Sequence, residues 1–284
     1  IERFPILNWL FPFDFSNQNE FQRLYCTSDK GLYRLQYELK KRMILRFKDD
    51  VLDLPPVEHF RETVEMNERQ KKEYTAMEDD FLSWYKDKIG DMPEAFRGRT
   101  VLMKMHGIRQ KAIEPKLPLI GEILHQNIEK EGRKTVLYTT YVPVAEDLRR
   151  RFRRFGVCYI DGKTGNIDRV KGIEEFETNP KKKLFIITAA GGESIELTAA
   201  SDFIYVNKPL TYADEKQALD RLHRRGQTKN VRAFHVTTAD SVDDRIDKLI
   251  TRKREEYERV MHGSVGLVRW FEETQDKNVR ELLE

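Results

Sequence analysis

The spacing of apolar residues divides the chain into two regions. Up to about residue 115, apolar side chains recur at intervals of three and four, as in GLYRLQYELKKRMILRF, which predicts a mostly helical segment. Within it VEHFRETVEM alternates like a strand, Asn67 and Gln70 form a capping-box pattern that begins a long helix, and Pro93 opens another helix. From about residue 116, short apolar runs alternate with amphipathic stretches. That order predicts an α/β fold with a parallel sheet covered by helices on both faces.

The second region contains five candidate strands, and the loops after them form the candidate site. The strands are TVLYTT, VCYI, LFIIT, DFIYV and VRAFHV, with helical stretches at about 143–155, 167–178, 212–223 and 241–261. In a parallel sheet the loops that follow the strands gather at the carboxyl edge, where ligands bind. These loops contain hydroxyl, glycine, lysine and arginine residues, which suit an anionic ligand such as phosphate.

One of these loops, in GVCYIDGKTG, is similar to a nucleotide-binding P-loop but lacks its spacing. The pattern G-x-x-x-x-G-K-S/T, counted back from Gly162, requires a glycine where the chain has Val157, and Gly156 is one residue too far away. We therefore interpret Lys163 and Thr164 as part of a strand-end turn that has another role.

Composition and charge narrow the class of protein. The 284 residues are 39% hydrophobic and 35% charged, which indicates a charge-rich globular chain with room for two domains or one large one. The net charge is only +3, but basic runs at 149–154, 181–183, 221–225 and 252–254 favour a polyanionic partner. A solvated helix face gives the same pattern. No apolar run approaches the roughly 18 residues of a membrane span, so no membrane partner is expected.

Cysteine and histidine usage gives no sign of a metal site. The two cysteines, Cys26 and Cys158, lie far apart, and the six histidines show no ligand spacing. We therefore expect neither a disulfide framework nor a metal bound by this chain, which fits a reducing compartment.

The most informative stretch is QALDRLHRRGQ. Arg221 and Arg224 lie three residues apart, so on one helix they would point the same way and could clamp a phosphoryl group. The alternative is a basic helix C-terminus, where the helix dipole favours cations.

This stretch resembles the last helicase motif of the SWI/SNF-type ATPases, which reads roughly Q-A-x-x-R-x-H-R-x-G-Q. Other segments resemble motifs of that family in the same order, namely LKKRMILRFKDDVLDLPP, HGIRQKAIEPKLP, GRKTVLYTTYVPVAEDLRRRF, YIDGKTGNIDRVKGIEEF, IITAAGGESIELTAASDFIYVN and VRAFHVTTADSVDDRIDKLITRKREEYERV. The resemblance covers nearly the whole chain. The chain departs from the family pattern at Phe47, Ser194, Glu196 and Asn207.

The resemblance implies a domain order and an activity. Residues 1–115 would be the end of a first helicase lobe plus a helical protrusion, 116–262 a second RecA-like lobe, and 263–284 a helical tail. The implied function is the C-terminal half of an ATP-dependent translocase on duplex DNA, with ATP and Mg²⁺ held mainly by the first lobe. The P-loop lysine and the Asp-Glu pair of that lobe are missing from this sequence, which begins at Ile1. We therefore expect a piece of a longer motor that is inactive without the first lobe.

The resemblance also implies roles for individual residues. Arg221 and Arg224 would act as arginine fingers, and Gly192 and Gln217 would line the same nucleotide cleft. The implied contacts to the DNA backbone come from Thr139, Thr140, Lys163, Thr164 and Thr188.

Two alternatives stay open, a non-catalytic nucleic-acid-binding module and an RNA helicase lobe. We expect a monomer that is not secreted and that is located in the cytoplasm or on the nucleoid, or in the nucleus of a eukaryote.

Overall fold

The chain divides into two compact units. The computed structural model describes residues 4–44, 48–88, 94–192 and 195–262. One unit comprises residues 1–51 with 251–284, and the other comprises residues 52–250.

The smaller unit is built from short helices around an aromatic and aliphatic core. Its first part contains α1 (Phe4–Leu10), α2 (Gln18–Tyr25), α3 (Asp29–Arg42) and α4 (Lys48–Val51). The side-chain oxygens of Asn17 and Ser28 accept hydrogen bonds from the first turns of α2 and α3, which fixes where these helices begin. Leu7, Phe15, Phe21, Leu35 and Leu39 form the core. The helical prediction for this part is confirmed, whereas Phe47 lies outside the described residues.

The larger unit contains a six-stranded sheet in which every pair of neighbouring strands is parallel. The strands are β1 (Val57–Val64), β2 (Thr135–Thr139), β3 (Val157–Ile160), β4 (Leu184–Thr188), β5 (Asp202–Tyr205) and β6 (Val231–Thr238), in the spatial order β1-β6-β5-β2-β4-β3. The five strands expected in the second region are confirmed. VEHFRETVEM is also a strand, and as β1 it pairs with β6 at the edge of the same sheet.

Helices cover both faces of this sheet, as the continuous apolar runs predict. The chain after β1 forms α5 (Glu68–Lys88), α6 (Glu94–Lys111), the 3₁₀ turn η1 (Glu114–Lys116), α7 (Leu117–Leu124) and the π-helical turn η2 (His125–Lys130). The later elements are α8 (Val142–Arg151), η3 (Arg153–Phe155), α9 (Asn166–Thr178), α10 (Tyr212–Leu219) and α11 (Val242–His262), which ends in the smaller unit.

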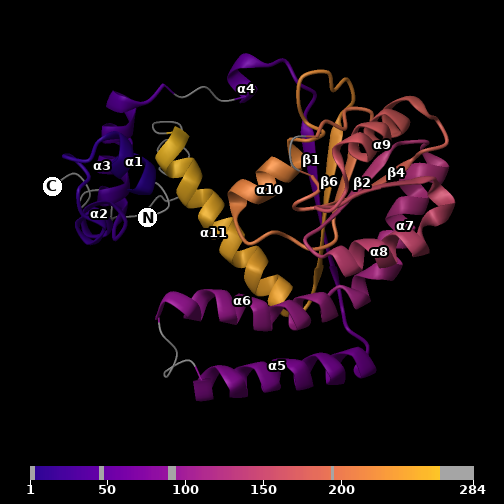
Figure 1. Ribbon diagram of the computed structural model, residues 1–284, viewed down its shortest axis with the longest axis horizontal. Coiled ribbons are helices and arrows are strands. Elements are labelled where there is room, and N and C mark those ends of the chain that lie inside the picture. Colours follow the sequence, from indigo (N-terminus) through magenta and orange to yellow (C-terminus); the bar gives the residue numbers. More distant parts are fainter. Residues whose placement is uncertain (1–3, 45–47, 89–93, 193–194, 263–284) are drawn as a thin grey trace, which may run out of the picture. The chain divides into compact units, whose positions relative to one another are not determined.

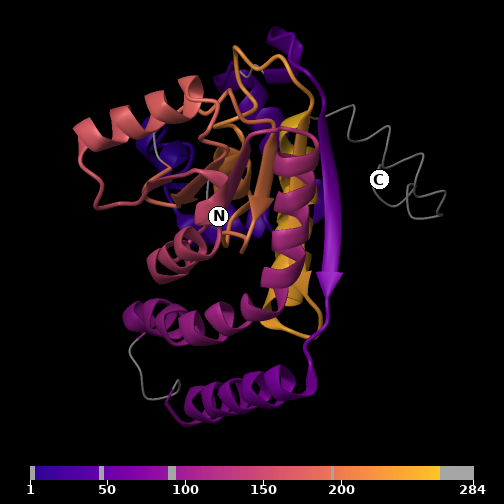
Figure 2. The ribbon, with the colours of Figure 1, turned by 90° about the vertical axis from the view of Figure 1, so that its right-hand side faces the viewer.

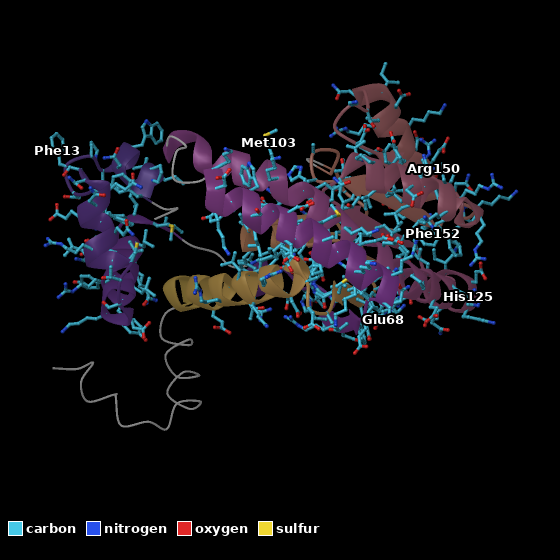
Figure 3. All side chains as sticks on the ribbon, turned by 90° about the horizontal axis from the view of Figure 1, so that it is seen from below. Phe13, Glu68, Met103, His125, Arg150 and Phe152 are labelled. Atoms are coloured by element: carbon cyan, nitrogen blue, oxygen red, sulfur yellow. The ribbon has the colours of Figure 1, made fainter. Side chains whose placement is uncertain are left out.

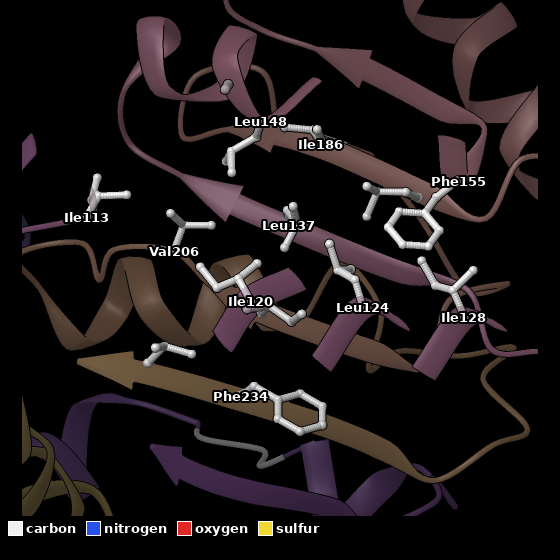
Figure 4. Packing of buried hydrophobic residues seen from close by; sticks show 14 of the residues in the cluster. Ile113, Ile120, Leu124, Ile128, Leu137, Leu148, Phe155, Ile186, Val206 and Phe234 are labelled. Atoms are coloured by element: carbon white, nitrogen blue, oxygen red, sulfur yellow. The ribbon is translucent and has the colours of Figure 1, made fainter. Parts of the chain in front are cut away.

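Alternate residues of each central strand enter different cores. Leu137 packs with α7, η2 and α8 on one face, and Figure 4 shows it between Ile120, Leu124 and Leu148. Its neighbours Val136 and Tyr138 pack on the other face with residues of α9 and α10. Because burying one large aliphatic side chain contributes about 1.5–3 kcal/mol, the two cores dominate the stability of the sheet.

α5 and α6 lie at the carboxyl edge of the sheet. Figure 1 and Figure 2 show both helices beyond the end toward which the β1 arrow points. The predicted capping box is confirmed, because the Gln70 N–H donates to Asn67 Oδ1 at 2.9 Å and the Asn67 N–H donates to Gln70 Oε1 at 3.0 Å. The Tyr74 hydroxyl then accepts from the N–H of Val242 at 2.7 Å, which fastens α5 to the start of α11.

No helix in the described part of the chain is long and apolar enough to cross a lipid bilayer.

Candidate functional site

A pocket of about 390 Å³ opens at the carboxyl edge of the sheet. It lies where β2 and β4 end and α10 and α6 approach, which is the edge at which parallel sheets bind ligands. Thr140, Gly192, Gln217 and Arg221 are among its lining residues. Of the residues predicted for the site, these four therefore share one pocket, which we call the strand-end pocket.

Arg221 reaches the pocket from a turn and not from a helix. The Thr211 hydroxyl caps α10 by accepting the Asp214 N–H at 3.1 Å, and α10 ends at Leu219. The expected helix over 212–223 is therefore too long. The Arg221 carbonyl oxygen accepts the N–H of Leu197 at 2.9 Å, which ties the turn after α10 to the loop after β4.

Arg224 is turned toward a different partner. Its Nη2 lies 2.9 Å from Glu196 Oε1, and its side chain is 43% exposed. The expectation that Arg221 and Arg224 share one helix and one direction is therefore wrong, because the helix stops before both of them.

A second arginine enters the strand-end pocket from α6. Arg109 lines it and is only 4% exposed. Its Nη2 donates to the Lys208 carbonyl oxygen at 2.6 Å, and its guanidinium lies 5.6 Å from the centre of the Tyr141 ring. Its Nε is buried and has no hydrogen-bond partner among the described residues. Sequence reasoning missed this residue, although HGIRQKAIEPKLP was one of the segments that resemble the family.

The side chain of Asn207 organises the end of β2. Its Oδ1 accepts the Thr139 hydroxyl at 2.6 Å and the Thr140 N–H at 3.1 Å, while its Nδ2 donates to the Thr140 hydroxyl at 2.7 Å. Thr139 is fully buried by this arrangement, whereas Thr140 stays at the pocket wall. Thr188 at the end of β4 is also buried, and its hydroxyl accepts the N–H of Gly191 at 3.2 Å. The predicted nucleic-acid contacts of Thr139 and Thr188 stay predictions.

In the GKT turn after β3, the carboxylate of Asp161 accepts hydrogen bonds from the residues that follow it. Asp161 Oδ1 accepts the Lys163 N–H at 2.9 Å and the Thr164 hydroxyl at 2.8 Å, and Oδ2 accepts the Tyr159 hydroxyl at 3.0 Å. In a P-loop, backbone N–H groups of this kind surround a phosphate. Here the side chain of Asp161 takes the place of that anion, while Lys163 is exposed at the tip of the turn.

Gly191 brings the loops after β3 and β4 together. A Cβ atom at this position would lie 2.5 Å from the Ile160 carbonyl oxygen and 2.6 Å from the Asp161 Cα. Only glycine allows this approach without moving the backbone. The loops after β3 and β4 are therefore in close backbone contact at Gly191.

Asp161→Asn is expected to lower the free energy of unfolding by an amount that depends on pH. Burial alone would raise the pKa of Asp161, but hydrogen bonds from Thr164, Tyr159 and Lys163 outweigh it and lower the pKa. A lowered folded-state pKa contributes stability above the unfolded value of about 3.9, and that stability is lost as the pH falls through the folded-state pKa. Urea unfolding of both proteins across an acid pH series measures the difference. A difference that stays constant with pH would contradict this role for the carboxylate.

The fold and part of the sequence match known helicase-like proteins. Residues 116–226 match the helicase conserved C-terminal domain. The ISWI chromatin-remodeling complex ATPase ISW1 of Saccharomyces cerevisiae is 26% identical over 283 residues, covering 89% of this chain and 25% of that protein. The chromatin-remodeling ATPase INO80 of Gibberella zeae is 32% identical over 152 residues, covering 52% of this chain and 8% of that protein. The chain thus spans a quarter or less of the length of these relatives.

A solved structure has the same architecture. The SWI2/SNF2 ATPase core of Sulfolobus solfataricus in complex with double-stranded DNA superposes with a TM-score of 0.60 at 21% identity, covering 91% of this chain and 59% of that chain. It supports the RecA-like assignment of the parallel sheet. The matched domain, the relatives and the shared fold together show that residues 116–226 carry a helicase conserved C-terminal domain and that the chain is similar to SNF2-type helicase-like ATPases.

Proposed function

We propose that the chain is the C-terminal half of an ATP-dependent translocase on double-stranded DNA. The observation that supports this most is the strand-end pocket, which gathers Arg221, Arg109, Gln217 and Gly192 at the carboxyl edge of the sheet. Guanidinium groups at such a pocket stabilise the negative charge that develops on a phosphoryl group during transfer. The relatives are named ATPases, which agrees with this chemistry.

We propose that this pocket contacts the phosphates of ATP. The lining includes the two arginines Arg109 and Arg221 against one carboxylate, Asp214. The buried, unpaired Nε of Arg109 is a donor to which a phosphate oxygen can bind. The described residues contain no cluster of His, Cys, Asp or Glu that could hold a metal ion. We therefore assign Mg²⁺ and the P-loop lysine to a first lobe, and the arginine fingers Arg221 and Arg224 to this chain. To act as an arginine finger, Arg224 then has to break its ion pair with Glu196.

The exposed turn residues suit a DNA backbone. Lys163 is exposed at the carboxyl edge, with Thr164 beside it and Thr140 at the pocket wall. We propose that these three contact phosphates, and that the buried Thr139 and Thr188 shape the same loops. Phosphate contacts do not depend on base sequence, as a motor that moves along any duplex requires. Such a protein acts where chromosomal DNA lies, which is the nucleus in a eukaryote.

ATP hydrolysis measured with and without a first lobe tests this function. We expect the purified chain alone to show no DNA-stimulated hydrolysis, because it lacks the P-loop. Fused or mixed with a SNF2-type first lobe, it should support hydrolysis that rises when duplex DNA is added.

The choice of nucleic acid decides between the alternatives in the same assay. Stronger stimulation by RNA than by duplex DNA would favour an RNA helicase lobe. No hydrolysis with any first lobe or nucleic acid, together with retained DNA binding, would favour a non-catalytic module and overturn the proposal.

A further inference from the structure

Basic residues gather at the amino edge of the sheet, opposite the strand-end pocket. β2, β4 and β3 are neighbours in the sheet. Arg133 and Lys134 precede β2, Lys181–Lys183 precede β4, and Arg153 and Arg154 precede β3 by a few residues. Because the strands are parallel, these three segments lie at the same edge. The dipole of α8 favours the arginines in its last turn, but it does not account for the lysines before β4.

Part of this edge is a groove of about 540 Å³, which we call the amino-edge groove. Its charged lining consists of Arg149, Arg150, Arg153 and Lys182 against a single carboxylate, Glu146. The groove lining therefore has a surplus of three positive charges.

The cations of the groove are only weakly neutralised by the protein itself. Asp147 is shared between Arg150, at 3.3 Å, and Arg151, and Lys182 lies 3.5 Å from Glu175. Arg153 is exposed and has no acidic partner within 4.0 Å in the described part of the chain. Exposed ion pairs contribute little, so these side chains can turn to an external anion at small cost. Figure 3 shows the Arg150 side chain projecting outward among other nitrogen-bearing side chains.

We propose that the amino-edge groove binds the sugar-phosphate backbone of a nucleic acid. Apart from its charged residues, the lining contains only Gly156 and Val157, so it offers no large apolar or aromatic side chain. Protein partners are usually anchored by such side chains, whereas phosphates are bound by the planar guanidinium of arginine and the ammonium of lysine. The guanidinium of Arg149 lies 5.3 Å from the centre of the Tyr159 ring, and this contact positions the guanidinium at the groove wall. The inference does not rest on the proposed function, because it concerns the opposite edge of the sheet.

Binding of a labelled duplex over a range of salt concentrations tests this groove. The variant Arg150→Glu/Arg153→Glu is compared with Lys71→Glu/Lys72→Glu, which makes the same charge change at exposed positions of α5. Fluorescence anisotropy of the full chain should show at least about a tenfold loss of affinity for the first variant relative to the second. The slope of log K against log salt should fall by about two, one for each phosphate contact removed. Circular dichroism and urea unfolding check that both variants are folded.

The same assay separates this groove from the carboxyl edge. If Arg150→Glu/Arg153→Glu binds the duplex within about twofold of its control, the proposal fails, whatever Lys163→Glu does. If it weakens binding and Lys163→Glu does not, the groove is supported and the DNA contacts in the proposed function fail. Polyglutamate is added as a competitor for the labelled duplex. Displacement as effective as that by unlabelled duplex would identify an acidic protein segment as the partner and overturn the proposal.

Discussion

Replacing Arg221 by alanine is expected to lower DNA-stimulated ATP hydrolysis by about 10³-fold when the chain is joined to a SNF2-type first lobe. Arg221 lines the strand-end pocket together with Gln217 and Gly192. We propose that its guanidinium faces the terminal phosphate of a triphosphate bound by the first lobe. Loss of that charge leaves the transition state with one fewer stabilising cation, while ATP is still held by the other lobe. The measurement is steady-state hydrolysis at saturating duplex DNA.

The neighbouring Arg225 provides a matched control for this substitution. It is exposed in the same turn and does not line the pocket. Arg225→Ala should therefore retain most of the rate, and its own DNA affinity should be checked in parallel. A loss of less than about tenfold for Arg221→Ala would contradict the arginine-finger role. An equal loss of hydrolysis rate for Arg225→Ala would show that the rate depends on the positive charge of this turn and not on the position of Arg221.

Arg221→Lys adds a test of geometry. Lysine keeps the charge but loses the planar fork that binds two phosphate oxygens at once. A rate close to that of Arg221→Ala would indicate bidentate contact, whereas a rate close to that of the unchanged protein would indicate that charge alone is sufficient.

The sheet could be predicted from the sequence because its signal is local. Runs such as LFIIT are buried on both faces, and such runs are continuous and bounded by polar or glycine residues. The start of α5 could be predicted for the same reason, since Asn67 and Gln70 satisfy each other's N–H groups within one turn.

The end of α10 could not be predicted because distant residues determine it. His223 Nε2 lies 2.8 Å from the carbonyl oxygen of Pro55, and the Leu197 N–H binds the Arg221 carbonyl. These partners lie far from α10 in the sequence, so the local helical pattern gives no sign of them. The burial of Arg109 in the pocket is also a tertiary effect. The sequence thus identified four of the pocket's lining residues, Thr140, Gly192, Gln217 and Arg221, whereas the structure adds Arg109 and leaves Arg224 out of the lining.

Asp243→Asn is expected to lower the free energy of unfolding by about 3–5 kcal/mol. Lys116 is 1% exposed, its Nζ donates to the Val206 carbonyl oxygen at 2.9 Å, and it forms an ion pair with the buried Asp243. Without Asp243 the ammonium keeps its burial but loses its counter-charge. Asp147, which is 35% exposed and pairs with Arg150 and Arg151, is the control, and Asp147→Asn should cost less than about 1 kcal/mol. Urea unfolding near neutral pH measures both.

The pH dependence identifies the cause of that loss. Burial lowers the pKa of Lys116, and the Asp243 carboxylate opposes the shift, so Asp243→Asn should lower this pKa further. A lysine whose folded-state pKa is depressed costs stability below its unfolded value of about 10.4, and the cost declines as the pH rises toward that value. The loss caused by Asp243→Asn should therefore shrink in alkaline buffer, and Lys116→Met/Asp243→Asn should recover part of it. A loss that is independent of pH, or no larger than that of Asp147→Asn, would show that the Lys116 ammonium does not depend on this carboxylate.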